Sequence, residues 1–184
     1  MDYTQLSDAE LVIEAKTGSQ LAFRELTNRF WPRLERYVAR LAPNSSEHED
    51  IVQESFVKIY LNLQGYTEKT QFSTWAYRIT HNTLIDHVRT LKQRATPFFD
   101  PEELFPHPIS NSRPDTDAEK ASIRKVLDEH LSDLQTKYRI PLVLYYFEDM
   151  NYKEISDVLR IPTGTVGVRL RRGLALLRTK FSLQ

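Results

Sequence analysis

The sequence contains no cysteine and no long apolar run, and both absences limit what the protein can be. Without thiols among its 184 residues, the chain forms no disulfide and holds no metal through thiolates. No run approaches the roughly twenty apolar residues that a membrane span needs, and the start of the chain lacks the basic and apolar segments of a secretory signal. We therefore expect a soluble, cytoplasmic protein that does not insert into membranes.

Residue combinations that perform catalysis are also missing. The carboxylates are scattered along helical patterns, without a nucleophile, a base and an orienting partner together. The five histidines show no paired spacing of the kind that metal sites use: His48, His81, His87, His107 and His130. We expect no metal, no cofactor and no enzymatic activity.

The net charge of zero conceals a segregation of charge along the chain. When Lys and Arg are counted against Asp and Glu, the net charge is −3 for residues 1–71, +3 for 72–95, −4 for 96–118, −1 for 119–150 and +5 for 151–184. Two basic stretches separated by an acidic one indicate two sites for a polyanion. The acidic surfaces are left for a protein partner.

Proline is concentrated in that acidic stretch, where five of the nine prolines occur between residues 97 and 114. Such a composition resists regular structure and behaves as an extended spacer. We therefore expect two small domains, residues 1–95 and 119–184, joined by a flexible linker over residues 96–118.

Capping signals and apolar spacing predict helices at the start of the chain. Ser7 and Glu10 form a capping box for a helix that ends at Gly18. Ser19 can cap a longer helix that continues through Pro32, with a kink near residues 28–32.

A second capping box, Ser46 and Glu49, follows a predicted turn at residues 43–45 and starts a helix from Glu47 to about Leu63. Its apolar spacing predicts a buried face of Val52, Phe56, Ile59, Tyr60 and Leu63. The opposite face carries Asp50, Gln53, Glu54 and Lys58, which spacing alone describes as a solvated face.

The next helix is predicted from a Ser73 cap to about Lys92, after a polar loop at residues 64–71. Phe72, Trp75, Ala76, Ile79 and Thr83 share one side, and Arg78, His81, Arg89 and Lys92 the other. Aromatic rings beside arginines suit single-stranded DNA, since bases stack on rings while cations follow the backbone. Taken alone, the helix also fits Trp75 as a core residue.

Residues 151–181 read as two helices joined by a tight turn. The first runs from about Tyr152 to Leu159 and is stopped by Ile161-Pro162, and Thr163 can cap the second. In the second helix Val166, Leu170, Leu174, Leu177 and Phe181 form an apolar face, whereas Val168, Arg171, Arg172 and Ala175 point away from it.

The basic second helix makes this pair a candidate helix-turn-helix. From Arg169 to the end there are five Lys or Arg residues and no acid, a concentration of charge that suits phosphates and guanine edges. Arginines in a last helix also favour its dipole and solubility, which is the alternative explanation.

Three segments resemble parts of the sigma-70 family, specifically the extracytoplasmic-function group (group 4). The segment Tyr152-Lys153-Glu154-Ile155, with Pro162-x-Gly164-Thr165-Val166, Arg169, Arg172 and Leu177-Arg178, resembles the promoter-binding domain. The segment from Asp50 to Tyr60 resembles the part that docks on the clamp of core RNA polymerase. The pattern F-x-x-W-x-x-R-I-x-x-N from Phe72 to Asn82 resembles the region that melts promoters and recognises the minus-10 element.

The resemblance implies an all-α transcription initiation factor with a region 2 helical bundle and a region 4 helix-turn-helix. It implies minus-35 contacts by Lys153, Thr163, Thr165, Arg169, Arg171 and Arg172. It implies minus-10 contacts by Tyr66, Thr67, Thr70, Phe72, Arg78, Asn82 and Arg89, with the loop residues lining a pocket for an extruded base. Core polymerase, through its clamp and flap, would bind Asp50, Gln53, Glu54 and Lys58, and an anti-sigma factor is a further implied partner.

Some positions depart from the family pattern, and two other functions stay open. Gln135 stands where a proline is common, and Gly167 and Gly173 stand in the basic helix, where each glycine is expected to cost about 1 kcal/mol relative to alanine. A stand-alone helix-turn-helix regulator would use only residues 120–184. An anti-anti-sigma-like interaction protein would bind partners without DNA. Neither alternative explains the segment 72–89.

Overall fold

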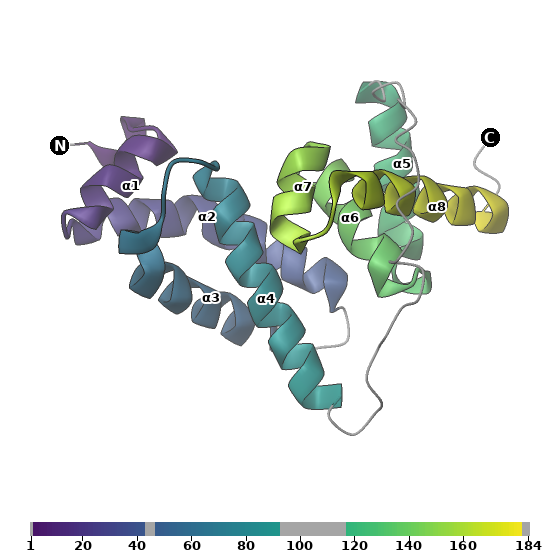
Figure 1. The fold of residues 1–184 in the computed structure, drawn as a ribbon, viewed down its shortest axis with the longest axis horizontal. Helices are drawn as coiled ribbons and strands as arrows, with labels where there is room; N and C mark the ends of the chain where they lie inside the picture. Colours follow the sequence, from purple (N-terminus) through teal and green to yellow (C-terminus); the bar gives the residue numbers. More distant parts are fainter. Residues whose placement is uncertain (1, 43–46, 93–116, 182–184) are drawn as a thin grey trace. The chain divides into compact units, whose positions relative to one another are not determined.

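The computed structural model describes residues 2–42, 47–92 and 117–181, and these residues form helices, turns and loops without any strand (Figure 1). The all-α prediction is confirmed. The chain divides into two compact units, residues 1–96 and 97–184. Most of the predicted linker lies outside the described residues, and its last two positions, Asp117 and Ala118, already belong to a helix.

The first unit is built around one long helix, α2 (Gln20–Leu41), which contacts three others. These are α1 (Asp8–Lys16), α3 (His48–Asn62) and α4 (Phe72–Lys92). Two short 3-10 segments complete the unit, η1 (Tyr3–Gln5) and η2 (Leu63–Gly65). Phe30 and Tyr37 of α2 are fully enclosed, and Tyr37 meets Tyr77 of α4 edge to face at 5.3 Å between ring centroids.

The predicted start of the chain is confirmed in detail. The Ser7 hydroxyl accepts a hydrogen bond from the Glu10 amide, and the Glu10 carboxylate accepts one from the Ser7 amide at 2.8 Å. Gly18 adopts a φ of 99°, a conformation open to glycine and costly for other residues. Ser19 caps α2, which continues through Pro32 as expected.

The predicted caps of two helices in this unit are wrong. The N-cap of α3 is Glu47, which makes no side-chain capping bond, and Ser46 and the predicted turn at 43–45 lie outside the described residues. Helix α4 begins at Phe72, so that Ser73 lies inside its first turn and its hydroxyl reaches the Gln71 side chain. The Gln71 carbonyl accepts the first helical hydrogen bond, from Trp75.

In the described part of the second unit, residues 117–181, three α-helices contact the last one. Its elements are α5 (Asp117–His130), η4 (Leu131–Asp133), α6 (Thr136–Tyr146), α7 (Tyr152–Leu159) and α8 (Thr163–Phe181). Helices α6 and α7 both contact α8 (Figure 1). Arg124 of α5 ties the unit together, because it donates to the Tyr146 carbonyl and pairs with the Asp149 carboxylate at 2.9 Å.

No helix in the described ranges of either unit is both long enough and apolar enough to cross a lipid bilayer.

Candidate nucleic-acid interfaces

Helix α7 begins with a complete capping box. The Asn151 side chain accepts hydrogen bonds from the amides of Lys153 and Glu154 at 3.0 Å, and the Glu154 carboxylate accepts one from the Asn151 amide at 2.8 Å. Ile155 and Val158 are fully buried on the inner face, as their spacing predicts. The box therefore fixes where the helix starts.

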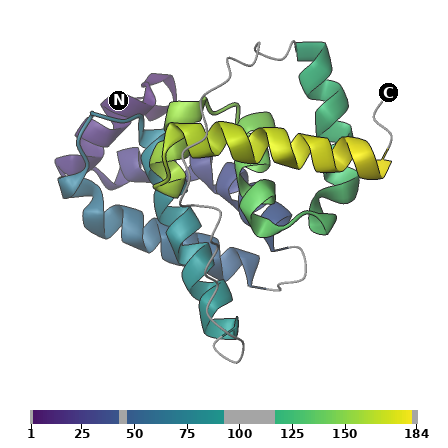
Figure 2. The ribbon, with the colours of Figure 1, turned by 45° about the vertical axis from the view of Figure 1, so that its right-hand side comes forward.

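A tight turn joins α7 to α8 (Figure 2). It is closed by Arg160, which adopts the left-handed conformation with φ 53° and ψ 42°. The amides of Arg160 and Ile161 both donate to the Ser156 carbonyl, and the Ser156 hydroxyl donates back to the Ile161 carbonyl at 2.6 Å. The predicted stop is thus in the right place, but the left-handed residue ends the helix before Pro162 can do so.

The predicted cap of the next helix is wrong by one residue. Thr163 is the first residue of α8, and the Pro162 carbonyl accepts the first helical hydrogen bond, from the Val166 amide at 3.1 Å. Proline suits this boundary because it has no amide to leave unpaired.

Helix α8 separates an apolar inner face from a basic outer one. Val166, Leu170 and Leu177 are buried, while Arg171 and Arg172 are exposed. Of the remaining residues implied for the minus-35 contact, Lys153 and Thr163 are exposed, and Thr165 and Arg169 are half-buried. The sequence prediction of which residues face outward is therefore confirmed for the two central arginines.

Gly173 lies on the inner face of α8 and lets it approach α6 closely. A Cβ atom added there would stand 2.7 Å from Leu142 Cδ1 and 3.3 Å from Tyr138 Cβ. Gly167 has no such constraint, since an added Cβ would meet only the Tyr152 ring, at 3.4 Å. The two glycines, expected to weaken the helix equally, therefore differ: Gly173 is needed for close packing against α6, whereas Gly167 has room for a side chain.

In the first unit, the loop before α4 is anchored by an aromatic cluster. The Tyr66 ring lies 5.0 Å from the Trp75 ring and 5.9 Å from the Phe72 ring, and all three side chains are buried. The Tyr66 hydroxyl donates to the Thr70 carbonyl at 2.6 Å, which closes the loop on itself. Burial raises the pKa of Tyr66, so this donor stays protonated at neutral pH.

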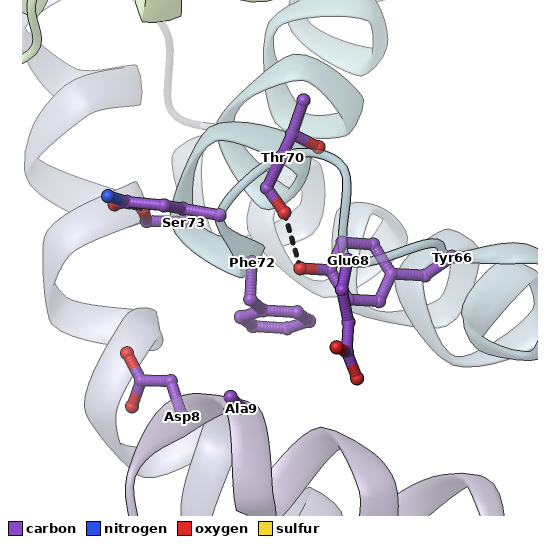
Figure 3. A pocket seen from close by; sticks show the side chains of 8 residues that line it. Asp8, Ala9, Tyr66, Glu68, Thr70, Phe72 and Ser73 are labelled. Atoms are coloured by element: carbon purple, nitrogen blue, oxygen red, sulfur yellow. Dashed lines mark hydrogen bonds between the residues drawn. The ribbon is translucent and has the colours of Figure 1, made fainter.

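A hollow of about 390 Å³ opens between this loop and α1, and we call it the α1-loop hollow. Asp8 and Ala9 form one side of it and face the Phe72 ring and the Glu68 carboxylate on the other (Figure 3). The lining is completed by Tyr66, Thr70, Gln71 and Ser73. Of the three loop residues predicted to line a pocket, Tyr66 and Thr70 do so, whereas Thr67 is exposed and is not part of the lining.

The outer side of α4 carries three of the predicted contact residues on one face. Asn82 and Arg89 are exposed and Arg78 is partly exposed, and their spacing of four and seven residues aligns them along the helix. The side chain of Lys92 lies outside the described residues.

His81 was expected beside these residues, and like Arg78 it is only partly exposed. Its ring is turned toward α2, where Nδ1 lies 3.0 Å from the Tyr37 hydroxyl. Burial lowers the pKa of His81 to about 4. The imidazole is therefore neutral at physiological pH and contributes no positive charge to this face.

Helix α3 presents an outer face that differs from the predicted one. Asp50 and Gln53 are exposed as expected. Val57 and Leu61 are 52% and 72% exposed on the same face, and Tyr60, which was expected to be buried, is 54% exposed. These five residues form what we call the α3 outer face.

Glu54 and Lys58, also predicted to be outside, connect α3 to α4. Glu54 pairs with Lys58 at 2.8 Å and with His87 at 2.6 Å, and both partners lower the pKa of its carboxyl group, Lys58 more strongly. The Lys58 amine donates to the Thr83 hydroxyl at 3.2 Å. Their charged groups are thus engaged within the unit.

Comparison with known proteins identifies both units. The sigma-70 region 2 model matches residues 26–94, and the sigma-70 region 4 model matches residues 124–177. The ECF RNA polymerase sigma factor SigW of Bacillus subtilis is 30% identical over 173 residues, which cover 90% of this chain and 91% of SigW. The chain belongs to the extracytoplasmic-function sigma factors.

A further relative is similar to this sigma factor in sequence, and two solved structures are similar to it in fold. The ECF RNA polymerase sigma-E factor of Haemophilus influenzae is 27% identical over 187 residues, covering 96% of each chain. The fold is similar to that of CnrH in complex with the cytosolic domain of CnrY, with a TM-score of 0.69 and 23% identity over 95% of this chain and 97% of that one. It is also similar to the sigma factor RpoE of Bartonella quintana in complex with the anti-sigma factor NepR, with a TM-score of 0.66 and 17% identity over 88% and 98% of the two chains.

The region 2 match begins inside α2 of this sigma factor, so α1 precedes it. Two of the residues that line the α1-loop hollow, Asp8 and Ala9, are therefore outside the matched segment. Sequence reasoning missed them because nothing in their spacing connects them with a loop some sixty positions later.

Proposed function

We propose that this sigma factor directs core RNA polymerase to promoters by holding the minus-35 duplex with α8 and the melted minus-10 strand with the 66–71 loop and α4. The observation that carries the proposal is that one chain contains two different candidate DNA-binding surfaces, one in each unit. One unit has a capped helix-turn-helix with an outward basic helix, and the other has a walled hollow beside a helix with exposed arginines. Residues 96–118 would act as the tether between the two domains.

At the minus-35 element, α8 would enter the major groove with its basic outer face. Arginine forks bind guanine edges and phosphates, which suits Arg169, Arg171 and Arg172. Thr163 and Thr165 lie in the first turn of α8, where free amides attract a phosphate. Lys153 is exposed at the start of α7 and would contact the backbone of the same duplex.

At the minus-10 element, the α1-loop hollow would hold one extruded base of the non-template strand. Its volume of about 390 Å³ lies at the lower end of the roughly 300–1,000 Å³ typical of small-molecule sites. Tyr66, Thr70 and Phe72 contribute to its walls, and the exposed Thr67 would meet the adjoining nucleotide. Extrusion costs a few kcal/mol, which contacts inside the hollow would offset.

The helix beside the hollow would follow the rest of the strand. Asn82 would hydrogen-bond a neighbouring base, and Arg78 and Arg89 would pair with phosphates along the same face of α4.

The chemistry of the hollow favours a particular class of base. The carboxylates of Asp8 and Glu68 face it from opposite sides and can only accept hydrogen bonds when ionised. Adenine, cytosine and guanine carry an exocyclic amino group that donates to such acceptors, whereas thymine carries none. We therefore expect an amino-bearing base at the captured position.

Core polymerase would bind the α3 outer face. Asp50 and Gln53 provide polar contacts at one end, and the exposed Val57, Tyr60 and Leu61 provide the apolar area that protein interfaces bury at their centre. Glu54 and Lys58 would act by holding α3 on α4 beneath this face. An anti-sigma factor is a further expected partner, since the similar structure of RpoE from Bartonella quintana contains the anti-sigma factor NepR.

Run-off transcription with purified core polymerase tests the proposal. Across a library of genomic fragments, the protein should enable polymerase to start at a limited set of sites that share two separated sequence elements. A stand-alone regulator would instead bind its sites tightly without polymerase and would not confer initiation. Polymerase that stays inactive with this protein across the whole library would contradict the proposal.

A further inference from the structure

Helix α1 is attached directly to the backbone of the loop that walls the hollow. The Lys16 amine donates to the Tyr66 carbonyl at 2.6 Å and lies 5.7 Å from the centroid of the Tyr66 ring. In return, the Gln64 side chain donates to the Lys16 carbonyl at 2.7 Å. Two hydrogen bonds thus join the last turn of α1 to the residues on either side of Gly65.

The other end of α1 is fixed as firmly. Arg29 of α2 pairs with Asp8 at 3.0 Å and with Glu25 at 2.9 Å, and it also donates to the carbonyls of Tyr3 and Thr4. Hydrogen bonds to Glu25 and Asp8 raise the pKa of Arg29, so it keeps its charge. Arg29 therefore holds Asp8 in place on the α1 side of the hollow. Lys16 holds Tyr66 in place on the loop side.

The tip of the loop is exposed to solvent at Thr67, Glu68 and Lys69, so little packing holds it in place. The position of the tip therefore depends on how firmly its base is fixed. A hydrogen bond from an ammonium group to a carbonyl is stronger than one between neutral groups, and this one is partly buried.

We propose that Lys16 is a positioning residue for strand capture: it fixes the Tyr66 backbone so that the loop and α1 together form a hollow of constant shape. The inference rests on the proposed capture of an extruded base in that hollow. Lys16 does not need to touch the DNA. It supplies preorganisation, so that the entropy of ordering the loop is not paid when the base enters.

The test uses the full-length protein bound to core polymerase. The ligands are single-stranded oligonucleotides that cover the melted promoter region, which is mapped beforehand by the permanganate reactivity of its thymines. An abasic site is introduced at each position in turn. The wild-type complex should lose affinity at one position, where the base enters the hollow. Lys16→Met should bind the intact oligonucleotide about tenfold more weakly, the effect expected from losing one charge-assisted hydrogen bond. It should also lose most of its sensitivity to that abasic site.

Matched variants separate positioning from general effects. Lys69→Met removes the same charge from the exposed tip of the same loop and should weaken intact and abasic oligonucleotides equally. Lys16→Arg keeps a donor and should restore part of the affinity. Gln64→Leu removes the reciprocal hydrogen bond at an exposed residue, so it should fold normally and show a smaller loss in the same direction.

The outcomes are distinguishable. If Lys16→Met and Gln64→Leu bind more weakly but keep the wild-type sensitivity to the abasic site, the positioning role is refuted while strand capture stands. If the wild-type complex shows no sensitive position, capture in the hollow is refuted, and the role of Lys16 with it.

Discussion

Replacing each of the two glycines of α8 with alanine should have opposite effects on stability. In a helix interior, alanine is favoured over glycine by about 1 kcal/mol. At Gly167 the added Cβ would lie 3.4 Å from the Tyr152 ring, an ordinary contact. Gly167→Ala should therefore raise the free energy of unfolding of the second unit by about 1 kcal/mol.

At Gly173 the helix propensity of alanine is opposed by a steric clash. The added Cβ would lie 2.7 Å from Leu142 Cδ1, well inside the roughly 3.5–4.0 Å at which carbon atoms attract. Leu142 is fully buried and cannot swing away, and Tyr138 Cβ blocks a shift at 3.3 Å. Overpacking of a dense core costs about 1–3 kcal/mol, so Gly173→Ala should lower the free energy of unfolding by about 1 kcal/mol.

Denaturant titration followed by far-ultraviolet circular dichroism measures both variants. Both tryptophans, Trp31 and Trp75, lie in the first unit, so tryptophan fluorescence follows that unit and serves as an internal control. Its transition should be unchanged in either variant. The expected difference between the variants is about 2 kcal/mol, equivalent to roughly 8–16 °C in Tm for a unit of this size. A Gly173→Ala protein as stable as Gly167→Ala would refute the close-approach argument.

Three further substitutions test the proposed DNA contacts, and a fourth, at His81, tests the pH dependence of stability. Arg171→Ala should weaken promoter binding and lower the slope of log affinity against log salt by about one, because one phosphate contact is lost; footprints that are equal at low and high salt would contradict this. Asn82→Ala should leave duplex binding intact and reduce open-complex formation, measured by permanganate reactivity of thymines in the melted region, and equal reactivity would argue against its contact with a base. His81→Gln should flatten the loss of stability in acid. The pKa of His81 is about 4 in the folded protein against about 6.5 when unfolded, so its contribution is complete above pH 6.5 and is lost as the pH falls toward 4. The wild type should lose up to about 3 kcal/mol more than the variant over that window, and parallel pH profiles would show that His81 is not buried. Glu68→Gln should reduce the preference for an amino-bearing base over thymine at the captured position, since an amide also donates hydrogen bonds, and an unchanged preference in competition binding would exclude Glu68 from base selection.

The parts of this fold that sequence predicted well are those determined by short-range chemistry. The capping boxes at Ser7 and Asn151 define their helices through bonds that span three residues, and the apolar spacing of α8 identifies its inner face. Such signals are contained in a few neighbouring positions, so no knowledge of the rest of the molecule is needed.

The failures occur where a distant element decides the outcome. Helical spacing assigned His81 to the outside, but its ring is only partly exposed and lies within hydrogen-bond distance of Tyr37 of α2. Spacing also assigned Tyr60 to the inside, yet Ile51 and Ser55 occupy the inward positions of α3. The contact between Lys16 and Tyr66 joins residues fifty positions apart and leaves no periodic pattern in the sequence.

The location of α1 ahead of the segment that matches sigma-70 region 2 affects how relatives of this protein should be compared. Alignments or truncated proteins that start at residue 26 begin partway along α2 and omit one wall of the α1-loop hollow. Differences in promoter choice that arise from positions 8 and 16 would then be attributed to the loop alone. Comparative surveys of strand opening in such proteins should therefore include the first twenty or so residues of each chain.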